Sequence, residues 1–286
     1  MLKWKKGQVA LFQSDLYMTN SLVVETPDFV LVADPCWLPR EVEEIRQYAE
    51  GIRAGRKFLL LFTHSDFDHI IGYGAFPEAE VIASQALADK KVEERQVILE
   101  QIRAFDDKYY VRRPYEITYP VVDHAMGTDG QCMIFGNTKL TFYMARGHNN
   151  DGMFTWVEPL GLFIAGDYLS DIEFPYIDDN SVSYEETLAK LESIADRHPF
   201  TLLVPGHGEA TQHPHEMRRR RDQSVNYIRA MRRLVAAGEQ EAVDRLIEGC
   251  AFPRNMSKFH QSNQKQFQSE MAGDLTENKK GISHND

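Results

Sequence analysis

The chain has 286 residues, of which 43% are hydrophobic and 11% aromatic, so it can form one large domain or two small ones with a packed core. Its formal net charge of −11 argues against general nucleic-acid binding, because proteins that bind phosphate backbones need a basic face. No apolar run approaches the roughly 18 residues that span a bilayer, and the basic segment 1–7 lacks an apolar signal core after it, so we expect no membrane partner and a cytoplasmic location.

The first third of the chain predicts a strand–helix–strand order. Pro39 begins a helix that we expect to run to about residue 54, with Glu41 and Glu43 in its first turn, where the helix dipole favours acidic side chains. The three cysteines are far apart in the sequence and odd in number, so no disulfide framework is implied. Strands are predicted at residues 8–12, 16–25, 28–34, 57–62 and 79–83.

A segment rich in metal-ligand side chains, Thr63-His64-Ser65-Asp66-Phe67-Asp68-His69, directly follows the predicted strand 57–62. It places two imidazoles and two carboxylates at the end of a buried strand. Burial of such groups without partners costs on the order of several kcal/mol, so they are usually paired or bound to a metal. We interpret them as candidate metal ligands, with an ion-paired loop cluster as the alternative.

The middle of the chain predicts an insertion followed by a hairpin. Residues 84 to about 112 look helical and charged, and residues 111–122 carry prolines and tyrosines. This helical insertion, at about residues 84–120, either covers the site as a lid or is a purely structural helix. Residues 131–144 alternate well enough for a hairpin, with Gly136-Asn137 at its turn.

Three more candidate ligands follow apolar runs beside glycines. His148 lies in Gly147-His148-Asn149-Asn150-Asp151-Gly152, Asp167 ends Gly161-Leu162-Phe163-Ile164-Ala165-Gly166-Asp167, and His207 lies in Pro205-Gly206-His207-Gly208. This pattern is expected where a strand ends in a tight loop.

The last third of the chain predicts helices. Ser183-Tyr184-Glu185-Glu186 matches a capping box and would begin a helix that runs to about residue 195. Two further helices are predicted at about 216–237 and 239–250, and the polar residues 272–286 are predicted to be disordered. The run Arg218-Arg219-Arg220-Arg221 indicates a solvated helix paired with nearby acids, or alternatively a cradle for an anionic group.

Together, the four motifs resemble those of the metallo-β-lactamase superfamily, whose usual first motif is His-x-His-x-Asp-His after a strand. The resemblance covers roughly residues 9 to 215. It implies an α/β fold in which two β-sheets lie between helical layers, an αββα four-layer sandwich with a C-terminal helical extension. On this basis we expect residues 1–215 to form the catalytic domain and helices in residues 216–271 to pack on it.

One position departs from the family motif, because Asp66 stands where the second histidine is usual. Two histidines and one carboxylate on each ion suit zinc, which we favour, and also iron, while oxygen ligands favour manganese. Asp66 could instead be a non-ligand that pairs with His64. The resemblance implies that one divalent ion is held by His64, Asp66 and His148, the other by Asp68, His69 and His207, and that Asp167 bridges them.

Two such ions about 3.5–4 Å apart can share a water and lower its pKa towards neutrality. The resulting hydroxide would attack a carbonyl or a phosphorus. We consider Asp68, Tyr168 and His260 as catalytic residues, with Tyr176 as a further candidate proton donor for the leaving group. Asp34 could orient a ligand from behind.

These residues favour a metal-dependent hydrolase of a small-molecule ester, thioester, lactone or phosphoester. An antibiotic-hydrolysing β-lactamase is less favoured, because no secretory signal is recognised. The second hypothesis is a di-iron redox protein, since flavo-diiron proteins of the superfamily carry a glutamate where this chain has Asp66. The region after His215 is too short and too helical for their flavodoxin module. A metal-binding module without turnover is the third hypothesis, and a homodimer is left open.

Overall fold

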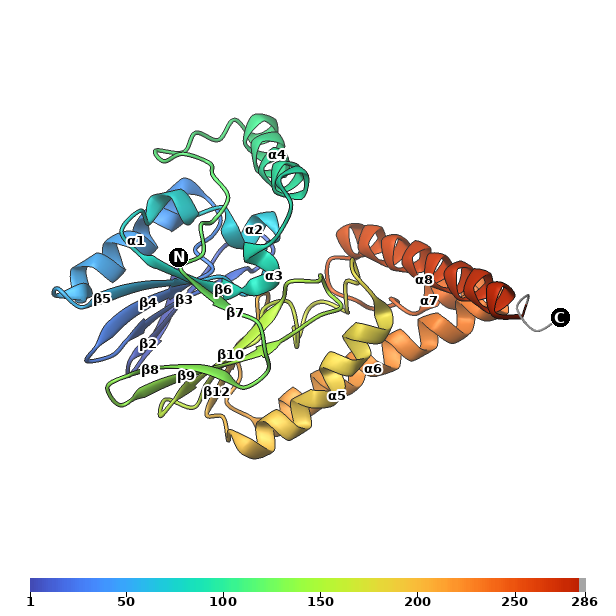
Figure 1. Ribbon diagram of the computed structural model, residues 1–286. Helices are drawn as coiled ribbons and strands as arrows, with labels where there is room; N and C mark the ends of the chain where they lie inside the picture. The colour runs from blue at the N-terminus through green and yellow to red at the C-terminus, as the bar shows by residue number, and fades with distance from the viewer. Residues whose placement is uncertain (283–286) are drawn as a thin grey trace.

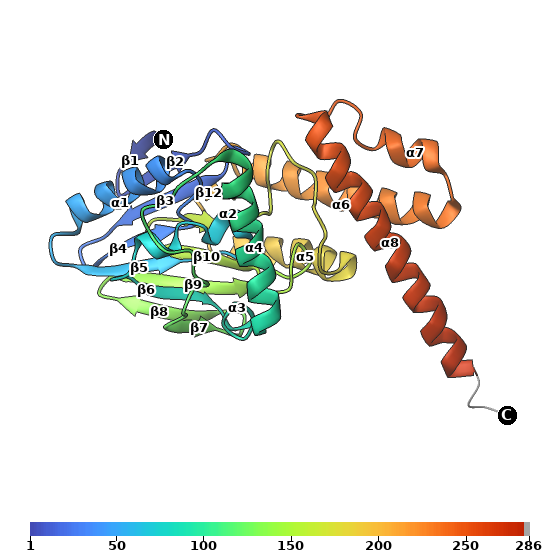
Figure 2. The same ribbon diagram turned by 90° about the horizontal axis from the view of Figure 1, so that it is seen from above.

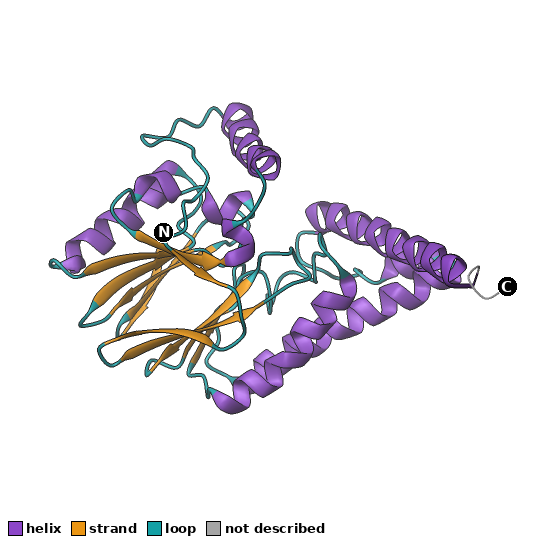
Figure 3. Ribbon diagram, in the orientation of Figure 1, coloured by secondary structure: helices purple, strands orange, loops and turns teal. Residues whose placement is uncertain are grey.

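Two β-sheets lie face to face between helices, as the predicted four-layer sandwich requires (Figures 1 and 3). The computed structural model describes residues 1–282, and side chains as far as residue 272. The first sheet has the order β1-β2-β3-β4-β5-β6-β7 and the second the order β12-β11-β10-β9-β8. Strands β4 to β7 run parallel, as do β11 and β12, and the other neighbours are antiparallel.

The first sheet consists of β1 (Leu2–Lys6), β2 (Val9–Gln13), β3 (Asn20–Glu25), β4 (Phe29–Ala33), β5 (Lys57–Leu61), β6 (Glu80–Ser84) and β7 (His124–Met126). The second consists of β8 (Gln131–Phe135), β9 (Thr138–Met144), β10 (Met153–Glu158), β11 (Leu162–Ile164) and β12 (Leu202–Val204). The helices are α1 (Pro39–Arg53), α2 (Phe67–Ile70), α3 (Gln85–Ala88), α4 (Val92–Tyr109), α5 (Ser181–Arg197), α6 (Pro214–Ala237), α7 (Gln240–Arg245) and α8 (Pro253–Ile282), with a short 3-10 helix at Tyr73–Ala75.

The central strand β4 shows how the layers are held together. All five of its residues are buried, and successive side chains point to opposite faces of the sheet. Phe29, Leu31 and Ala33 enter the core between the two sheets, whereas Val30 and Val32 enter the core under helix α1. A third core lies between the second sheet and helices α5 and α6. The strand is therefore apolar throughout, as expected for a central strand that is covered on both faces.

The C-terminal helices form a projecting bundle. Helices α6, α7 and α8 lie together beyond the end of the sandwich, and α8 extends away from the sheets towards the C-terminus (Figures 1 and 2). Among the described residues, no helix is long and apolar enough to cross a membrane. The predicted strands at 8–12, 28–34, 57–62 and 79–83, the helix at 39–54 and the hairpin at 131–144 are all found, with end points that differ by one or two residues.

Other boundaries differ from the sequence predictions. The strand predicted at 16–25 begins only at Asn20, because Tyr17 and Met18 have φ values of 55° and 48° in a turn. Helix α5 begins before the predicted capping box: Asn180 is its N-cap, and its side chain accepts hydrogen bonds from the backbone nitrogens of Val182 and Ser183.

The end of the chain differs most from the prediction. Helix α8 was not predicted as a separate helix, and it runs to Ile282 where disorder was predicted from residue 272. A packed helix can continue into a polar segment because each added residue gains one backbone hydrogen bond. The remainder of the predicted tail, residues 283–286, lies outside the described residues.

Candidate metal centre

Seven candidate ligands converge at one end of the sandwich, where strands from both sheets end. The segment after β5 carries four of them, the β9–β10 loop carries one, and the segments after β11 and β12 carry one each. We call His64, Asp66 and His148 the first ligand group, and Asp68, His69 and His207 the second. Within each group the ligand atoms lie within 4.8 Å of one another, and Asp167 lies within that distance of the first group.

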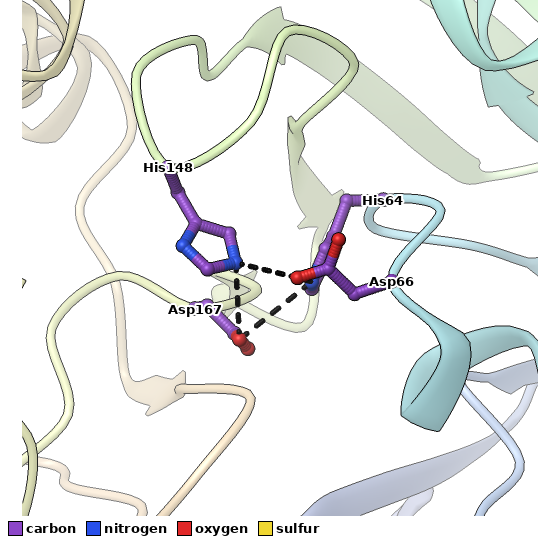
Figure 4. Close-up of side chains that lie close together, drawn as sticks. All are labelled: His64, Asp66, His148 and Asp167. Atoms are coloured by element: carbon purple, nitrogen blue, oxygen red, sulfur yellow. Dashed lines mark hydrogen bonds and ion pairs between the residues drawn. The ribbon is translucent and has the colours of Figure 1, made fainter. Parts of the chain in front are cut away.

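The first ligand group surrounds a small space (Figure 4). The Nε2 atom of His148 lies 3.1 Å from Asp66 Oδ2 and 3.3 Å from Asp167 Oδ2. The Nε2 atom of His64 lies 3.6 Å from each of the same two oxygens. Ligand atoms bound tetrahedrally at about 2.1 Å from one ion lie about 3.4 Å apart, so these spacings match a single metal site.

The second ligand group has similar spacings and shares Asp167. The Nε2 atoms of His69 and His207 each lie 3.5 Å from Asp68 Oδ2. Asp167 approaches His69 Nε2 at 3.1 Å with Oδ1 and His207 Nε2 at 3.3 Å with Oδ2. Its carboxylate therefore faces both groups, which is the position expected of a bridging ligand.

Buried partners on the far side of each ring orient His64 and His69. Asp34 Oδ2 lies 3.0 Å from His69 Nδ1 and also accepts the Thr63 hydroxyl at 2.6 Å. Because that hydroxyl proton is used, His64 Nδ1, 2.9 Å from Thr63 Oγ1, is the donor in its bond to the threonine. The predicted supporting role of Asp34 agrees with this geometry. Its φ of 46° is unusual for a non-glycine residue and marks strain of the kind found at functional sites.

Backbone carbonyls orient the other two imidazole rings, those of His148 and His207. His148 Nδ1 donates to the carbonyl of Tyr176 at 2.9 Å, and His207 Nδ1 donates to the carbonyl of Tyr17 at 3.0 Å. All four histidines are thus held through Nδ1, and all four present Nε2 to the centre. Such outer hydrogen bonds fix the tautomer of metal-binding histidines.

Two side chains in the β9–β10 loop support Asp66 and were missed by the sequence analysis. Asn149 donates from Nδ2 to Asp66 Oδ1 at 3.2 Å, which leaves Oδ2 to face the histidines. Asp151 is buried and accepts from the Ser65 backbone nitrogen at 3.1 Å, from the Ser65 hydroxyl at 2.6 Å and from Lys90 at 2.9 Å. Both residues stand in the glycine-flanked segment that carries His148, but their partners Asp66 and Ser65 are more than 80 positions away in the chain.

Close packing around Asp167 requires glycine at position 206. A Cβ atom on Gly206 would collide with Asp167 Oδ1. The glycine before His207 therefore lets the strand end approach the shared carboxylate.

The buried polar atoms at the centre fit a bound cation. His64 Nε2, His69 Nε2 and Asp167 Oδ1 are buried without a hydrogen-bond partner. With the His69 proton on Nδ1, the lone pair of Nε2 faces a carboxylate oxygen 3.1 Å away, and the two repel each other unless a proton or a cation lies between them. Unpaired buried polar groups are costly, so the residues present fit divalent metal ions.

The electrostatics of the centre lead to the same conclusion. Burial disfavours charge on His69, but the carboxylates of Asp167, Asp68 and Asp34 outweigh burial and raise the pKa of His69 well above its usual value. Burial acts in the same way on His207, where the carboxylates, Asp167 foremost, nevertheless raise the pKa to about 10. Protons and metal ions would therefore compete for the same Nε2 atoms.

Tyr168, one of the predicted catalytic residues, does not face the centre. Tyr168 is buried, and its hydroxyl donates to the carbonyl of Arg146 at 2.6 Å and accepts from the backbone nitrogen of His148 at 3.2 Å. It braces the loop that carries His148, because its ring packs in the core between the second sheet and helix α5. Tyr176, by contrast, lines the cavity above the centre.

His260 lies inside the helical bundle and not at the site. It accepts a hydrogen bond from the hydroxyl of Tyr227 at Nδ1 (2.9 Å) and donates from Nε2 to the carbonyl of Val243 at 3.0 Å. Its place on helix α8 turns it towards α6 and α7, and burial lowers its pKa. Both ring nitrogens are occupied, so it is not a proton donor for a substrate.

Three of the four arginines in the run pair with acids, as the first interpretation predicts, but the run is not solvated throughout as that interpretation expected. Arg219 and Arg220 bind Glu216 at 2.6 and 2.9 Å, and Arg221 pairs with Glu192. Arg220 is buried and also donates to the carbonyl of Leu169 at 3.0 Å. Arg220 and Arg221 therefore tie helix α6 to neighbouring elements, whereas Arg219 binds within its own helix.

A cavity of about 310 Å³ opens above the centre. The predicted insertion contributes Gln101 of helix α4 to its lining, and helix α8 contributes Met256 and Phe259. Its remaining lining residues are Tyr17, Trp37, Asp66, Phe67, Asp68, His148, Asp167, Glu173, Phe174, Tyr176, Asp178 and His207.

The chain is similar in sequence to known proteins. The model of the metallo-β-lactamase superfamily matches residues 14–207. Two type 2 metallo-β-lactamases, from Bacillus sp. (strain 170) and Bacillus cereus, are 24% and 23% identical over 215 residues, which cover 72% of this chain and 73% of each relative.

Solved structures show the same fold. A metallo-β-lactamase family protein from Thermus thermophilus matches with a TM-score of 0.63 and 17% identity, over 93% of this chain and 94% of its own. An archaeal metallo-β-lactamase superfamily protein from Sulfolobus tokodaii matches with a TM-score of 0.52 and 14% identity, over 77% of this chain and 86% of its own.

Proposed function

Since this chain belongs to the metallo-β-lactamase superfamily, we propose that it is a metal-dependent hydrolase with two divalent ions held at the candidate centre. The first ligand group holds one ion, the second holds the other, and Asp167 is shared. The observation that carries the proposal is the contact of His69 Nε2 with Asp167 Oδ1 at 3.1 Å, two buried atoms without a hydrogen-bond partner that a shared cation would satisfy.

Zinc is the ion that we favour, with iron and manganese as alternatives. Zinc accepts imidazole and carboxylate together, and each group offers two imidazoles with one carboxylate. The additional carboxylate at Asp66 would bring the first group closer to the preference of harder ions.

When bound, the two ions would supply a water of lowered pKa and polarise the oxygen of the scissile group. The chain's own residues position the reactants. Asp68 lines the cavity and can take the proton of a water that approaches there. Tyr176 also lines the cavity and is our candidate donor of the leaving-group proton, because Tyr168 and His260 are engaged elsewhere.

The substrate that we propose is a small-molecule ester, thioester, lactone or phosphoester, and we retain a cytoplasmic location and a homodimer as hypotheses. Residues 1–215 would form the catalytic domain and the helices of residues 216–271 a wall of its pocket. The lining by Met256 and Phe259 supports that division of roles.

A di-iron redox protein is the second candidate function, and the carboxylate of Asp66 next to His148 is the observation that favours it. Against it, the described residues after 213 form helices α6, α7 and α8, whereas a flavodoxin module is a doubly wound sheet with helices. A metal-binding module without turnover is the third.

Elemental analysis of the purified protein, followed by assays on phosphodiesters, thioesters and lactones, tests the proposal. We expect two metals per chain and hydrolysis without added reductant. His69→Ala is the test variant, and His215→Ala is a matched control because His215 is exposed and outside both ligand groups. One metal per chain in a saturated, active preparation would refute the dinuclear site. Oxygen consumption with a reductant, and no hydrolysis, would favour the redox protein.

A further inference from the structure

The cavity above the candidate centre has aromatic walls. Trp37 packs edge-on against Phe67 at 5.2 Å, and Tyr176 packs edge-on against Phe259 at 4.9 Å. All four rings line the cavity, together with Phe174. The volume of about 310 Å³ suits a small organic molecule, and these rings offer it both apolar contact and π faces.

Two carboxyl groups of the lining are outside both ligand groups. Glu173 and Asp178 line the cavity together with members of both ligand groups, and the backbone nitrogen of Asp178 donates to the carbonyl of His148 at 2.8 Å. Neither belongs to a cluster that could hold an ion. Burial raises the pKa of the Glu173 carboxyl group, whereas two bound cations nearby would favour its charged form, and Asp178 is exposed to solvent.

No compensating cation lines the cavity. Among the side chains that the structure describes, the lining includes neither a lysine nor an arginine. Lys90 acts electrostatically on Asp178 and Lys108 on Tyr17, but both lie outside the lining. Lys90 is held by the buried carboxylate of Asp151 at 2.9 Å.

The sum of these charges disfavours an anion. The carboxylates of Asp66, Asp68 and Asp167 offset three of the four positive charges of two divalent ions. Glu173 and Asp178 add two negative charges, so the surroundings of a bound substrate are negative overall. An anionic substrate group would have no arginine or lysine partner, whereas a cationic group would meet carboxylates and ring faces, the combination that binds quaternary ammonium ions.

We infer that this protein binds a substrate with a positively charged group on an apolar body, recognised by Glu173, Asp178 and the aromatic walls of the cavity. This inference rests on the proposed function in placing the scissile bond at the metal centre. In the ester case the reaction consumes one water: its hydroxyl joins the acyl carbon, the carbon–oxygen bond breaks, and a proton passes to the departing alcohol. No other co-reactant is required.

Binding of a non-hydrolysable probe tests the inference directly. Phenyltrimethylammonium and benzenesulfonate have similar bodies and opposite charges, and neither is cleaved by water addition at a carbonyl. Calorimetric titration into zinc-loaded protein keeps the ligand carboxylates occupied. We expect the ammonium probe to bind about tenfold or more tightly than the sulfonate.

Variants locate the probe. Glu173→Gln and Asp178→Asn should each weaken ammonium binding by about three- to tenfold and keep the wild-type metal content. Glu186→Gln removes an equal charge from an exposed position on helix α5, outside the lining, and should leave binding unchanged. The inference would be overturned if the ammonium probe failed to bind or if the protein preferred the sulfonate. It would also be overturned if Glu173→Gln and Asp178→Asn bound the ammonium probe as tightly as wild type does.

A turnover measurement separates this inference from the proposed function. Benzoylcholine and its uncharged isostere 3,3-dimethylbutyl benzoate differ only in charge, and we expect the larger kcat/KM for benzoylcholine. Equal rates on both esters would overturn the charge preference and leave hydrolysis standing. Absence of hydrolysis of all four substrate classes, esters, thioesters, lactones and phosphoesters, together with tight, Glu173-dependent ammonium binding would count against the proposed function and support the inference.

Discussion

The two ligand groups are built from the same residue types but are held differently. In the second group His69 is completely buried, and its outer nitrogen meets the charged carboxylate of Asp34. In the first group Asp66 keeps 35% of its side chain exposed and is oriented by the neutral amide of Asn149. A charged partner strengthens a histidine ligand more than a neutral one, so we expect the second group to hold its ion more tightly.

One histidine of each group is instead held by a backbone carbonyl. The outer nitrogen of His148 donates to the carbonyl of Tyr176, in the loop after β11. That of His207 donates to the carbonyl of Tyr17, 190 positions away, so the charged partner that sets the second group apart is Asp34, behind His69. Ligands that share a residue type and a motif can therefore differ in affinity because of what lies behind them.

Loss of the shared carboxylate should have the largest effect. Asp167→Ala removes the oxygens that face His69, His148 and His207, so both ions should be weakened together. We expect activity to fall on the order of 1000-fold and metal content to drop below one ion per chain. Elemental analysis after dialysis measures this, and retention of both ions at full occupancy would show that Asp167 is not shared.

Single histidines should separate the two groups. His69→Ala and His207→Ala should each empty mainly the second site, and His148→Ala the first, with about 100-fold or larger losses of activity. Stoichiometric chelation of wild type should remove the ion of the first group before the other. Simultaneous loss of both ions in every variant would break the comparison, since the two groups would then form one cooperative unit.

Substitution of Asp34 or Asn149, which hold the candidate ligands from outside the centre, should change the metal affinity of the two groups by smaller and unequal factors. Asp34→Asn should weaken the second ion by about 10- to 100-fold, and Asn149→Ala should weaken the first by less, because a charged hydrogen bond is replaced in one case and a neutral one is lost in the other. Competition with a fluorescent zinc chelator gives both affinities. Equal losses in the two variants would mean that the charge of Asp34 does not matter.

Metal removal should make the stability of the protein depend on pH. In the metal-free centre the carboxylates raise the pKa of His207 from its usual 6.5 to about 10. A histidine whose pKa is higher in the folded than in the unfolded protein stabilises the fold fully at pH values below its unfolded-state pKa. This stabilisation is lost as the pH rises through the folded-state pKa. Metal-free protein should therefore lose on the order of 5 kcal/mol between pH 6.5 and 10, while the zinc-loaded protein, whose Nε2 atoms carry no proton, should not. Urea unfolding at several pH values measures the difference.

Residue spacing could predict the candidate ligands but, apart from Asp34, not their supports. His64, Asp68, His148 and His207 follow apolar strands beside turns, a local pattern that a sequence displays. The bond between Asn149 and Asp66 joins positions 83 apart, and only the folded chain brings them together. The directions of side chains were also hidden, so Tyr168 and His260 were predicted at the site although they lie behind it or in the bundle.

Helix α8 shows the same limit for the fold. Its buried stripe consists of Met256, His260, Asn263 and Phe267, at helical spacing. Two of these four residues are polar, so the apolar period that predicts an amphipathic helix is interrupted. Their polarity is compensated by partners in other elements, such as the backbone nitrogen of Ile177, which donates to Asn263.

The smallest effect should come from restoring the usual histidine of the family motif. Asp66→His replaces a charged oxygen ligand by a neutral, softer imidazole, so the first group should prefer zinc over manganese more strongly than wild type does. Loss of one negative charge beside the ions should also lower the pKa that governs the rise of activity with pH, because the wild-type carboxylate donates charge to its metal. The fold should survive, since the side chain is partly exposed at the cavity and lies outside the apolar core. Metal competition and pH–rate profiles of both proteins measure the two shifts. An unchanged metal preference together with an unchanged pKa would mean that Asp66 pairs with His64 without binding a metal.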